Sequence, residues 1–465
     1  MEEVAEYILN LLKENKAGYC EVRAEKVKSN SFILKNSNLE LGESSINIGI
    51  GARYTINGSL GFLAVNDFDK TRIKELVEKS IRLTKKCQKK SENTGFGESD
   101  INIQDYKVKQ DKKIEDIEPS ECLKILKDLD NIAKDAEGRV FSLYTSLNNK
   151  YFVNIDGSKI KAEIPRIGGM YLFILDNGNK SLQRKFDFGA SGGWEILQGF
   201  KLNEKILNEV NALKNTLNRG VKLKSENMDV VLGSEVTGIA VHESGGHPYE
   251  ADRIIGRESA QAGESFLNKD YLGKQLGSEK VTIVDDPTIE NGYGYFLYDD
   301  EGVKAKRKFL MKDGIVNDFL HNRETAFAMG MKNNGSARAS DYNKEALVRM
   351  SNTIMLPGDY NEEDIIKDVK KGVYIKNFME WNIDDRRWQQ KYVGSEAYLI
   401  EKGEIVKPVI SPVLEITTPA FYKAIDAIGK KIEYSAGDCG KGEPMQGIPV
   451  WLGGPMIRLR NVHIK

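Results

Sequence analysis

The 465-residue sequence is poor in cysteine and contains no long hydrophobic run. Its cysteines are far apart and include no Cys-x-x-Cys pair, which argues against a disulfide framework and favours a reducing compartment. No apolar stretch approaches the roughly 18 residues needed to cross a bilayer, and the acidic start MEEVAEYILN is not typical of a signal peptide. We therefore expect a cytoplasmic protein that does not associate with membranes.

An excess of charge is also absent, because 68 basic and 69 acidic residues give a formal net charge of −1. Balanced charge provides no general attraction to nucleic acid or to anionic lipid, so we expect neither as a partner. The hydrophobic fraction of 40% and the charged fraction of 29% are those of an ordinary globular protein. The length predicts about two to three domains.

The first half of the chain alternates helical and strand patterns. Apolar residues at helical spacing predict helices over residues 2–15, 71–87, 120–136 and 202–217. Alternating apolar residues predict strands over residues 31–34, 45–54 and 60–65, and again from 139 to about 192. The Asn57-Gly58 pair is typical of a hairpin turn. We therefore predict an α+β fold in which residues 1–220 form a domain of helices and antiparallel sheet.

Strand patterns dominate the second half. A short strand pattern at residues 228–232 precedes one helical segment, and most later segments alternate like strands. The polar stretch at residues 218–227 is typical of a linker. We predict that residues 221–465 form a mainly β catalytic domain with a metal-carrying helix.

The metal-binding signal comes from two histidines that lie five residues apart. The segment reads His242-Glu243-Ser244-Gly245-Gly246-His247. Two neutral imidazoles can bind zinc, and an adjacent glutamate that does not bind the metal can take a proton from water. The pattern therefore predicts a hydrolytic metal site, with His242 and His247 as ligands and Glu243 as general base.

The spacing of these histidines does not suit a regular α-helix. Residues four apart point about 40° apart around such a helix, whereas residues five apart point about 140° apart. The Gly245-Gly246 pair tolerates unusual dihedral angles, and Pro248 disfavours the α region at His247. We therefore predict a helix that is capped by Ser234, stays regular to about Ser244 and then kinks, bulges or ends.

A third ligand is required, and residue chemistry leaves several candidates open. The candidates are Glu250 and Asp252 nearby, and His321, Cys439 and His463 at a distance. Cys439 lies in a glycine-rich stretch whose backbone can present a thiolate, so on chemistry alone it ranks equal to the two carboxylates. The carboxylates could instead orient the imidazoles or lie on the surface. His321 could be a transition-state donor or a structural histidine.

Five aromatic residues are candidates either for the wall of a peptide groove or for ordinary packing. They are Trp381, Trp388, Tyr293, Tyr295 and Tyr298.

Two longer motifs resemble the signatures of the TldD/PmbA metallopeptidase family. They are His242-Glu243-x-x-Gly246-His247-x-x-Glu250-x-Asp252 and Cys439-Gly440-Lys441…Gln446-x-x-Pro449-Val450. The resemblance implies a cytoplasmic peptidase in which His242, His247 and Cys439 bind one zinc ion per chain and Glu243 is the catalytic base. It also implies a dimer, formed either by two copies or with a paralogous subunit that lacks the metal motif.

We therefore expect a zinc-dependent peptidase that hydrolyses flexible or unfolded peptides held along a sheet edge. The alternative is a non-hydrolytic metal-binding subunit of a protein complex. Glu243 argues against that alternative, because a structural zinc site has four protein ligands and needs no adjacent base. A cysteine hydrolase with Cys439 as nucleophile would leave the His-Glu-x-x-x-His spacing unexplained.

Overall fold

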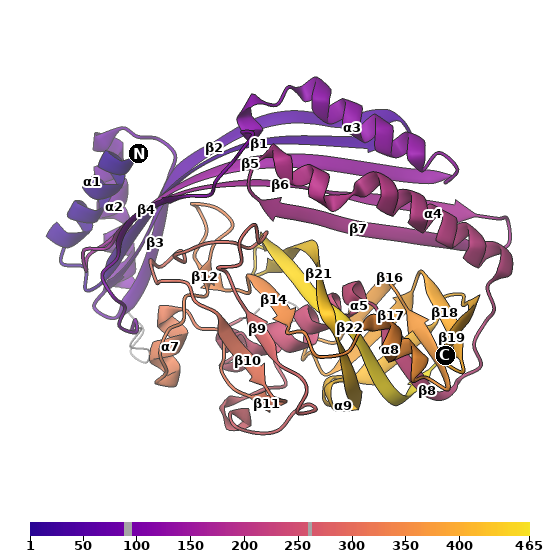
Figure 1. The fold of residues 1–465 in the computed structure, drawn as a ribbon. Coiled ribbons are helices and arrows are strands. Elements are labelled where there is room, and N and C mark those ends of the chain that lie inside the picture. Colours follow the sequence, from indigo (N-terminus) through magenta and orange to yellow (C-terminus); the bar gives the residue numbers. More distant parts are fainter. Residues whose placement is uncertain (88–94, 259–262) are drawn as a thin grey trace.

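The computed structural model describes residues 1–87, 95–258 and 263–465, and these residues build two large sheets (Figure 1). The strands of the first sheet are β1 (Cys20–Lys35), β2 (Asn38–Ile56), β3 (Ser59–Val65), β4 (Ile103–Lys107), β5 (Gly138–Asn154), β6 (Lys159–Asp176) and β7 (Ser181–Ser191). In the described residues their order is β3-β2-β1-β5-β6-β4, and β7 also pairs with β6. Only the β4–β6 pair among them is parallel.

Four helices pack on the first sheet. They are α1 (Glu2–Glu14), α2 (Lys70–Lys86), α3 (Pro119–Ile132) and α4 (Leu202–Arg219). The buried apolar stripes of α1 and α2 join one core cluster with β1–β3, and those of α3 and α4 join a second cluster with β5–β7. All four helices occur where the periodicity predicts them, although α3 ends at Ile132 and not at residue 136.

The long strand β1 shows where the strand prediction was incomplete. It spans 16 residues and starts well before the predicted strand at 31–34. Residues 26–31 are half-buried and, apart from Val27, polar, so they show no clear alternation. Pairing with β2 on one side and β5 on the other extends the strand. The predicted hairpin turn is confirmed, because Asn57 and Gly58 have φ of 50° and 79°.

The second sheet contains thirteen strands within the described part of the chain. They are β8 (Glu226–Leu232), β9 (Ile283–Asp285), β10 (Lys308–Lys312), β11 (Ile315–Val316), β14 (Asn352–Met355), β15 (Lys371–Ile375), β16 (Phe378–Ile383), β17 (Gln389–Gly394), β18 (Ala397–Glu401), β19 (Glu404–Pro408), β20 (Val413–Thr417), β21 (Ile425–Lys441) and β22 (Gln446–Ile464). The main path is β11-β10-β9-β14-β22-β8-β15-β18-β19, while β20 and β21 both pair with β22 and the β16–β17 hairpin joins through β20.

Short elements complete the second half. They are the pair β12 (Ala337–Arg338) and β13 (Leu347–Val348), and the helices α5 (Ser234–Ala240), α6 (Ala251–Ile254), α7 (Arg323–Met329), α8 (Glu362–Lys367) and α9 (Thr418–Ala424). The fold is therefore α+β and its C-terminal half is mainly sheet, as the sequence predicts. No helix in the described residues is both long and apolar enough to span a membrane.

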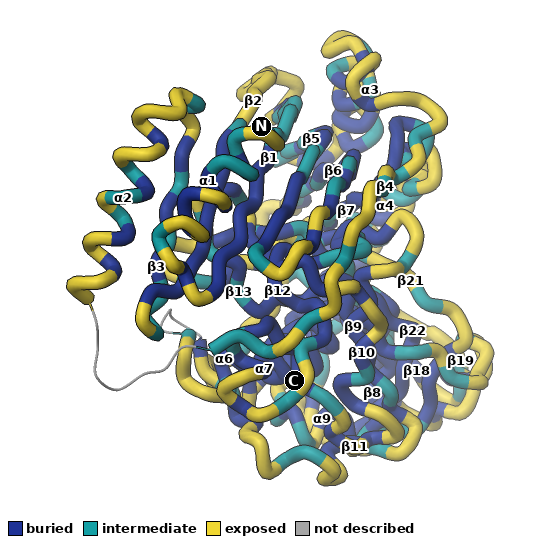
Figure 2. Tube along the Cα trace, turned by 90° about the vertical axis from the view of Figure 1, so that its left-hand side faces the viewer, coloured by how far each residue is buried: buried dark blue, intermediate teal, exposed yellow. Residues whose placement is uncertain are grey.

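The first sheet arches over the second (Figure 1), and buried segments of both meet between them (Figure 2). Side chains connect the two layers: Arg53 pairs with Glu301 at 2.5 Å, and Arg166 donates to the carbonyl of Tyr293 at 2.9 Å. The chain enters the second sheet after α4. We therefore propose a domain boundary between residues 220 and 221.

The buried strand β8 leads directly into α5, the helix that approaches the histidines. Gly233 joins the two elements, and a Cβ there would lie 2.2 Å from the carbonyl oxygen of Lys376. Gly233 is also the residue that precedes the first helical turn, and no side chain caps it. The predicted Ser234 cap is therefore wrong, because close packing of this turn on Lys376 selects glycine instead.

Candidate metal centre

A π-helix over Val241–Gly246 continues α5; it carries His242, and His247 follows directly after its last residue. The backbone N–H of His247 donates to the carbonyl of His242, which is the i→i+5 pattern of this helix type. Because each hydrogen-bonded ring closes one residue later than in an α-helix, residues five apart lie on the same side. The two imidazole centroids are 4.9 Å apart. The predicted distortion of the helix is confirmed.

The bulge differs from the prediction in its position and its cause. It begins at Val241, before the predicted break at Ser244. Neither glycine of the Gly245-Gly246 pair has a positive φ. His247 keeps α-region dihedral angles (φ −52°, ψ −41°), and Pro248 follows it in a short 3-10 turn. The argument from Pro248 is therefore wrong, because hydrogen bonding within the bulge, not proline, changes the helical register.

The glycine pair is instead required for space. A Cβ on Gly245 would lie 2.7 Å from both Ile283 Cδ1 and the Tyr422 hydroxyl. A Cβ on Gly246 would lie 2.0 Å from Met350 Sδ. A Cβ at either position would therefore force these side chains or the bulge itself to move, which glycine avoids.

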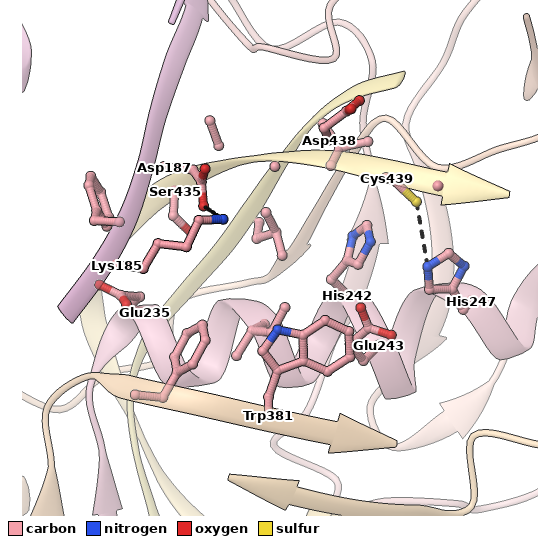
Figure 3. A pocket seen from close by; sticks show the side chains of 18 of the residues that line it. Lys185, Asp187, Glu235, His242, Glu243, His247, Trp381, Ser435, Asp438 and Cys439 are labelled. Atoms are coloured by element: carbon pink, nitrogen blue, oxygen red, sulfur yellow. Dashed lines mark hydrogen bonds and ion pairs between the residues drawn. The ribbon is translucent and has the colours of Figure 1, made fainter. Parts of the chain in front are cut away.

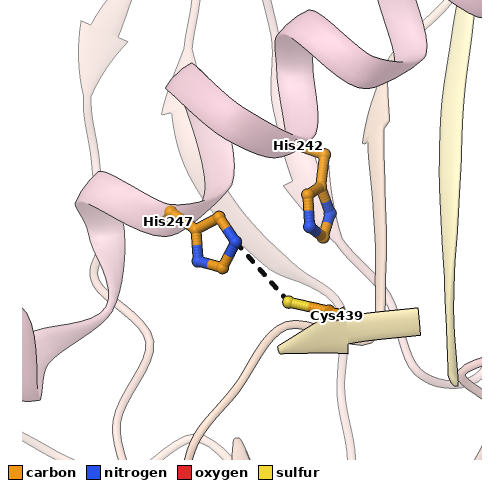
Figure 4. Close-up of side chains that lie close together, drawn as sticks. All are labelled: His242, His247 and Cys439. Atoms are coloured by element: carbon orange, nitrogen blue, oxygen red, sulfur yellow. Dashed lines mark hydrogen bonds between the residues drawn. The ribbon is translucent and has the colours of Figure 1, made fainter. Parts of the chain in front are cut away.

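Cys439 on β21 completes a group of three potential ligands (Figure 4). Its Sγ lies 3.5 Å from His247 Nε2, and one ligand atom each of Cys439, His242 and His247 lies within 4.8 Å of the others. Burial lowers the pKa of both imidazoles, which favours the neutral form that binds metal. His242 Nδ1 is buried and has no hydrogen-bond partner among the described residues. Two imidazoles and a thiol fit zinc.

The charges around Cys439 favour loss of its thiol proton. Burial raises its pKa, but His247 and Arg349 lower it more strongly, to about 7. Arg349 is fully buried and donates to the carbonyl oxygens of Cys439 and Gln446. Arg349 therefore holds the β21–β22 hairpin in the position that presents the thiol.

Glu250 orients His247 from the side opposite Cys439. Its Oε2 lies 2.9 Å from His247 Nδ1 and 2.5 Å from Arg253 Nε. Burial raises the pKa of Glu250, but Lys441 and Arg253 lower it well below its ordinary value. Glu250 therefore carries a negative charge, which favours a proton on Nδ1 and leaves Nε2 available to a metal.

The second carboxylate of the motif has a different partner. Asp252 accepts two hydrogen bonds from Lys441 Nζ, at 2.7 and 2.8 Å, and Lys441 also donates to the Val348 carbonyl at 2.7 Å. Both Glu250 and Asp252 are buried, so the surface interpretation is wrong for each. Asp252 orients no imidazole; together with Lys441 it ties the helical segment to the strand of Cys439.

We expect Glu250→Gln to weaken zinc binding about 10- to 100-fold, the usual effect of losing a residue that orients a metal ligand. The amide lacks the charge that favours a proton on His247 Nδ1. Zinc retention against a competing chelator, followed by elemental analysis, measures the effect. Glu264→Gln is a matched control, because the side chain of Glu264 is 71% exposed. Wild-type retention in a cooperatively folding Glu250→Gln variant would contradict the role.

The three potential ligands open into a cavity of about 360 Å³ between the two sheets (Figure 3). Its walls come from β7, the β16–β17 hairpin, the histidine helix and the β21–β22 hairpin. Trp381 points into it from β16, whereas the other four aromatic candidates are not part of its lining. Glu243 lines the same cavity, and its Oε2 lies 2.5 Å from Arg387 Nη1.

The remaining two histidines lie elsewhere. His321 is fully buried, its Nδ1 is 3.2 Å from Thr325 Oγ1, and burial lowers its pKa to about 4. It does not line the cavity, which fits the structural interpretation. His463 is exposed at the end of β22, where it contacts Ser225 and Asn227.

Sequence reasoning missed the roles of three residues at this site: Arg349, Lys441 and Arg387. Lys441 follows Cys439 by two positions inside the second motif, so its position was a usable signal. Arg387 lies in the turn between β16 and β17, and nothing in the surrounding residues distinguishes it from Arg386. Only the folded hairpin brings Arg387 to Glu243.

Comparison with known proteins places the chain in a family. Family sequence models match at residues 20–84 (PmbA/TldA metallopeptidase domain 1), 112–216 (central domain) and 225–465 (C-terminal domain). A metalloprotease of Methanocaldococcus jannaschii is 31% identical over 97% of this chain and 99% of its own length. A zinc metalloprotease TldD homolog of Saccharolobus solfataricus is 23% identical over 96% of both. The chain belongs to the TldD/PmbA metallopeptidase family.

Solved structures share the fold. TldE from Thermococcus kodakarensis superposes with a TM-score of 0.77 at 16% identity and covers 99% of both chains. A Thermotoga maritima protein superposes with a TM-score of 0.80 at 17% identity and covers all of both chains.

Proposed function

We propose that this chain is a zinc-dependent peptidase that hydrolyses flexible or unfolded peptides. The observation that carries the proposal is the convergence of two neutral imidazoles and an acidified thiol on one side of a cavity that also contains a carboxylate. Within the described residues the group has three donors, which is the number in a catalytic zinc site. Relatives described as metalloproteases support the reaction type.

The proposed mechanism assigns one task to each side chain. His242, His247 and Cys439 hold the zinc ion, one per chain. Zinc bound there would acidify a water molecule and polarise the substrate carbonyl. Glu243 accepts a proton as water adds to the carbonyl carbon and returns it to the nitrogen as the C–N bond breaks.

Two strand edges at the cavity support an extended peptide substrate. In the described residues β7 pairs with β6 as its one partner strand, and β21 pairs with β22 and forms one further bridge, from Gly429 to Tyr360, so the cavity segments of β7 and β21 each keep an edge that no strand pairs with. Residues 185–187 of β7 and 435–440 of β21 line the cavity. A peptide that adds to such an edge must be extended, which favours flexible or unfolded substrates.

We also propose that the chain functions together with a second subunit. The structural likeness to TldE supports a dimer, formed by two copies or with a paralogue that lacks the His-Glu-x-x-x-His motif. Native mass measured with and without such a paralogue distinguishes the two forms. We also propose a cytoplasmic location, because all four cysteines lie in described residues and none forms a disulfide.

One observation favours a different hydrolase. The contacts from Cys439 to His247 and from His247 to Glu250 would also suit a cysteine nucleophile with an oriented base. That reading gives His242 and Glu243 no role.

Metal removal separates the two mechanisms. We expect a chelator to abolish hydrolysis of unfolded casein, because both the acidified water and the polarised carbonyl depend on zinc. Activity should return as zinc approaches one equivalent per chain. Hydrolysis that continues without metal, but stops after alkylation of the thiol, would support the cysteine mechanism instead.

A further inference from the structure

Glu243 is engaged by a buried arginine. Arg387 Nη1 lies 2.5 Å from Glu243 Oε2, and the two side chains are only 8% and 6% exposed. Both residues line the cavity that the three potential ligands enter. Little water reaches this pair, so its electrostatic attraction is far less screened than that of a surface ion pair.

The turn between β16 and β17 holds the backbone of Arg387 in a fixed conformation. Arg387 has φ of 65°, a left-handed conformation that costs energy in a residue with a Cβ. Its N–H donates to the Asp384 carbonyl at 3.0 Å, and its own carbonyl accepts from Thr418 Oγ1 at 2.7 Å. The preceding Arg386 points outward, where its 65% exposed side chain lies 3.8 Å from Glu264.

The ion pair between Glu243 and Arg387 affects whether Glu243 can itself bind the metal. A carboxylate is itself a zinc ligand, and Glu243 follows a ligand candidate directly in the chain. If Glu243 bound the metal, the site would have four protein ligands and would be closed, like a structural zinc site. Arg387 offers the carboxylate a second positive partner inside the same cavity.

We propose that Arg387 is a positioning residue that keeps Glu243 off the metal, so that the fourth coordination position stays open to water and substrate. This inference rests on the metal site of the proposed function. It assigns the difference between a hydrolytic and a structural site to one residue of the β16–β17 hairpin, outside both family motifs.

The test compares metal binding in Arg387→Gln and wild type. Loss of the guanidinium frees Glu243 to bind, so zinc should resist a competing chelator about tenfold longer, while turnover falls about 10- to 100-fold. The visible absorption of the Co²⁺-substituted protein, which reports the number and type of ligands, should change. In the double variant Arg387→Gln/Glu243→Gln, retention and spectrum should return to those of Glu243→Gln alone.

The controls separate this proposal from the function on which it rests. Arg386→Gln should match wild type in retention, spectrum and turnover. If Arg387→Gln fails to fold, Arg387→Lys carries the test, with a smaller change in the same direction. Wild-type retention and an unchanged Co²⁺ spectrum in the Arg387 variant would overturn the proposal while the zinc peptidase stands. A wild-type chain that binds no zinc would overturn both.

Discussion

Replacing Glu243 with glutamine should lower kcat for peptide hydrolysis by about 10²- to 10⁴-fold, the range that a general base contributes. The amide has nearly the same shape and still reaches the cavity, but it cannot accept and return a proton. Zinc content should stay near one per chain, because Glu243 is not among the three grouped donors. KM should change little, because the lost interaction acts in the transition state.

The same variant should also be less stable. Glutamine breaks the buried ion pair between Glu243 and Arg387, and removing one partner of such a pair costs up to about 3–5 kcal/mol. The free energy of unfolding, measured by denaturant titration, reports this cost separately from turnover. Glu243→Gln protein that is folded and zinc-loaded yet hydrolyses peptide normally would refute the general base. Loss of zinc from folded protein would make Glu243 a ligand instead.

Cys439→Ser should have the second large effect, on metal content. If the roughly 10–16 kcal/mol of a four-ligand zinc site is shared among its ligands, one thiolate accounts for about 3 kcal/mol, or about a hundredfold in affinity. A serine hydroxyl remains protonated near neutral pH and is a poor substitute. Elemental analysis after dialysis against a weak chelator should therefore find much less zinc, and hydrolysis should fall with it.

A cysteine distant from the site provides the control for this experiment. Cys122 is buried within α3 and does not line the cavity, so Cys122→Ser should keep full zinc content. Full occupancy in Cys439→Ser, with the zinc held as tightly as in wild type, would contradict the assignment of the third ligand.

Much of the fold was predictable because it follows from local patterns. The helices α1 to α4 bury apolar stripes that recur at helical spacing, so their positions could be read from the sequence. The middle of strand β1 could not, because residues 26–31 show no clear alternation and depend on pairing with β2 and β5. Prediction succeeded where the apolar pattern of a segment shows which face it buries. It failed where pairing with neighbouring strands determines the structure of the segment.

The candidate site was also only partly predictable from the sequence. The spacing of His242 and His247 was enough to predict a distorted helix, since a regular one would point the rings apart. The spacing did not show that the distortion is a π-helix, nor that Gly245 and Gly246 are needed for contact with the sheet below. Dihedral preferences are local properties, whereas the space available to a Cβ depends on residues distant in sequence.

The sequence by itself determined the chemistry of this protein: two imidazoles, a neighbouring carboxylate and a cysteine free to become a thiolate. Only the tertiary structure decided which candidate joins the histidines, because Cys439 lies 192 residues from His247 and reaches it through the β21–β22 hairpin. It also decided that Arg387, 144 residues from Glu243, faces that carboxylate. Local patterns specify which groups are present, but the distances between them are set by the packing of two sheets.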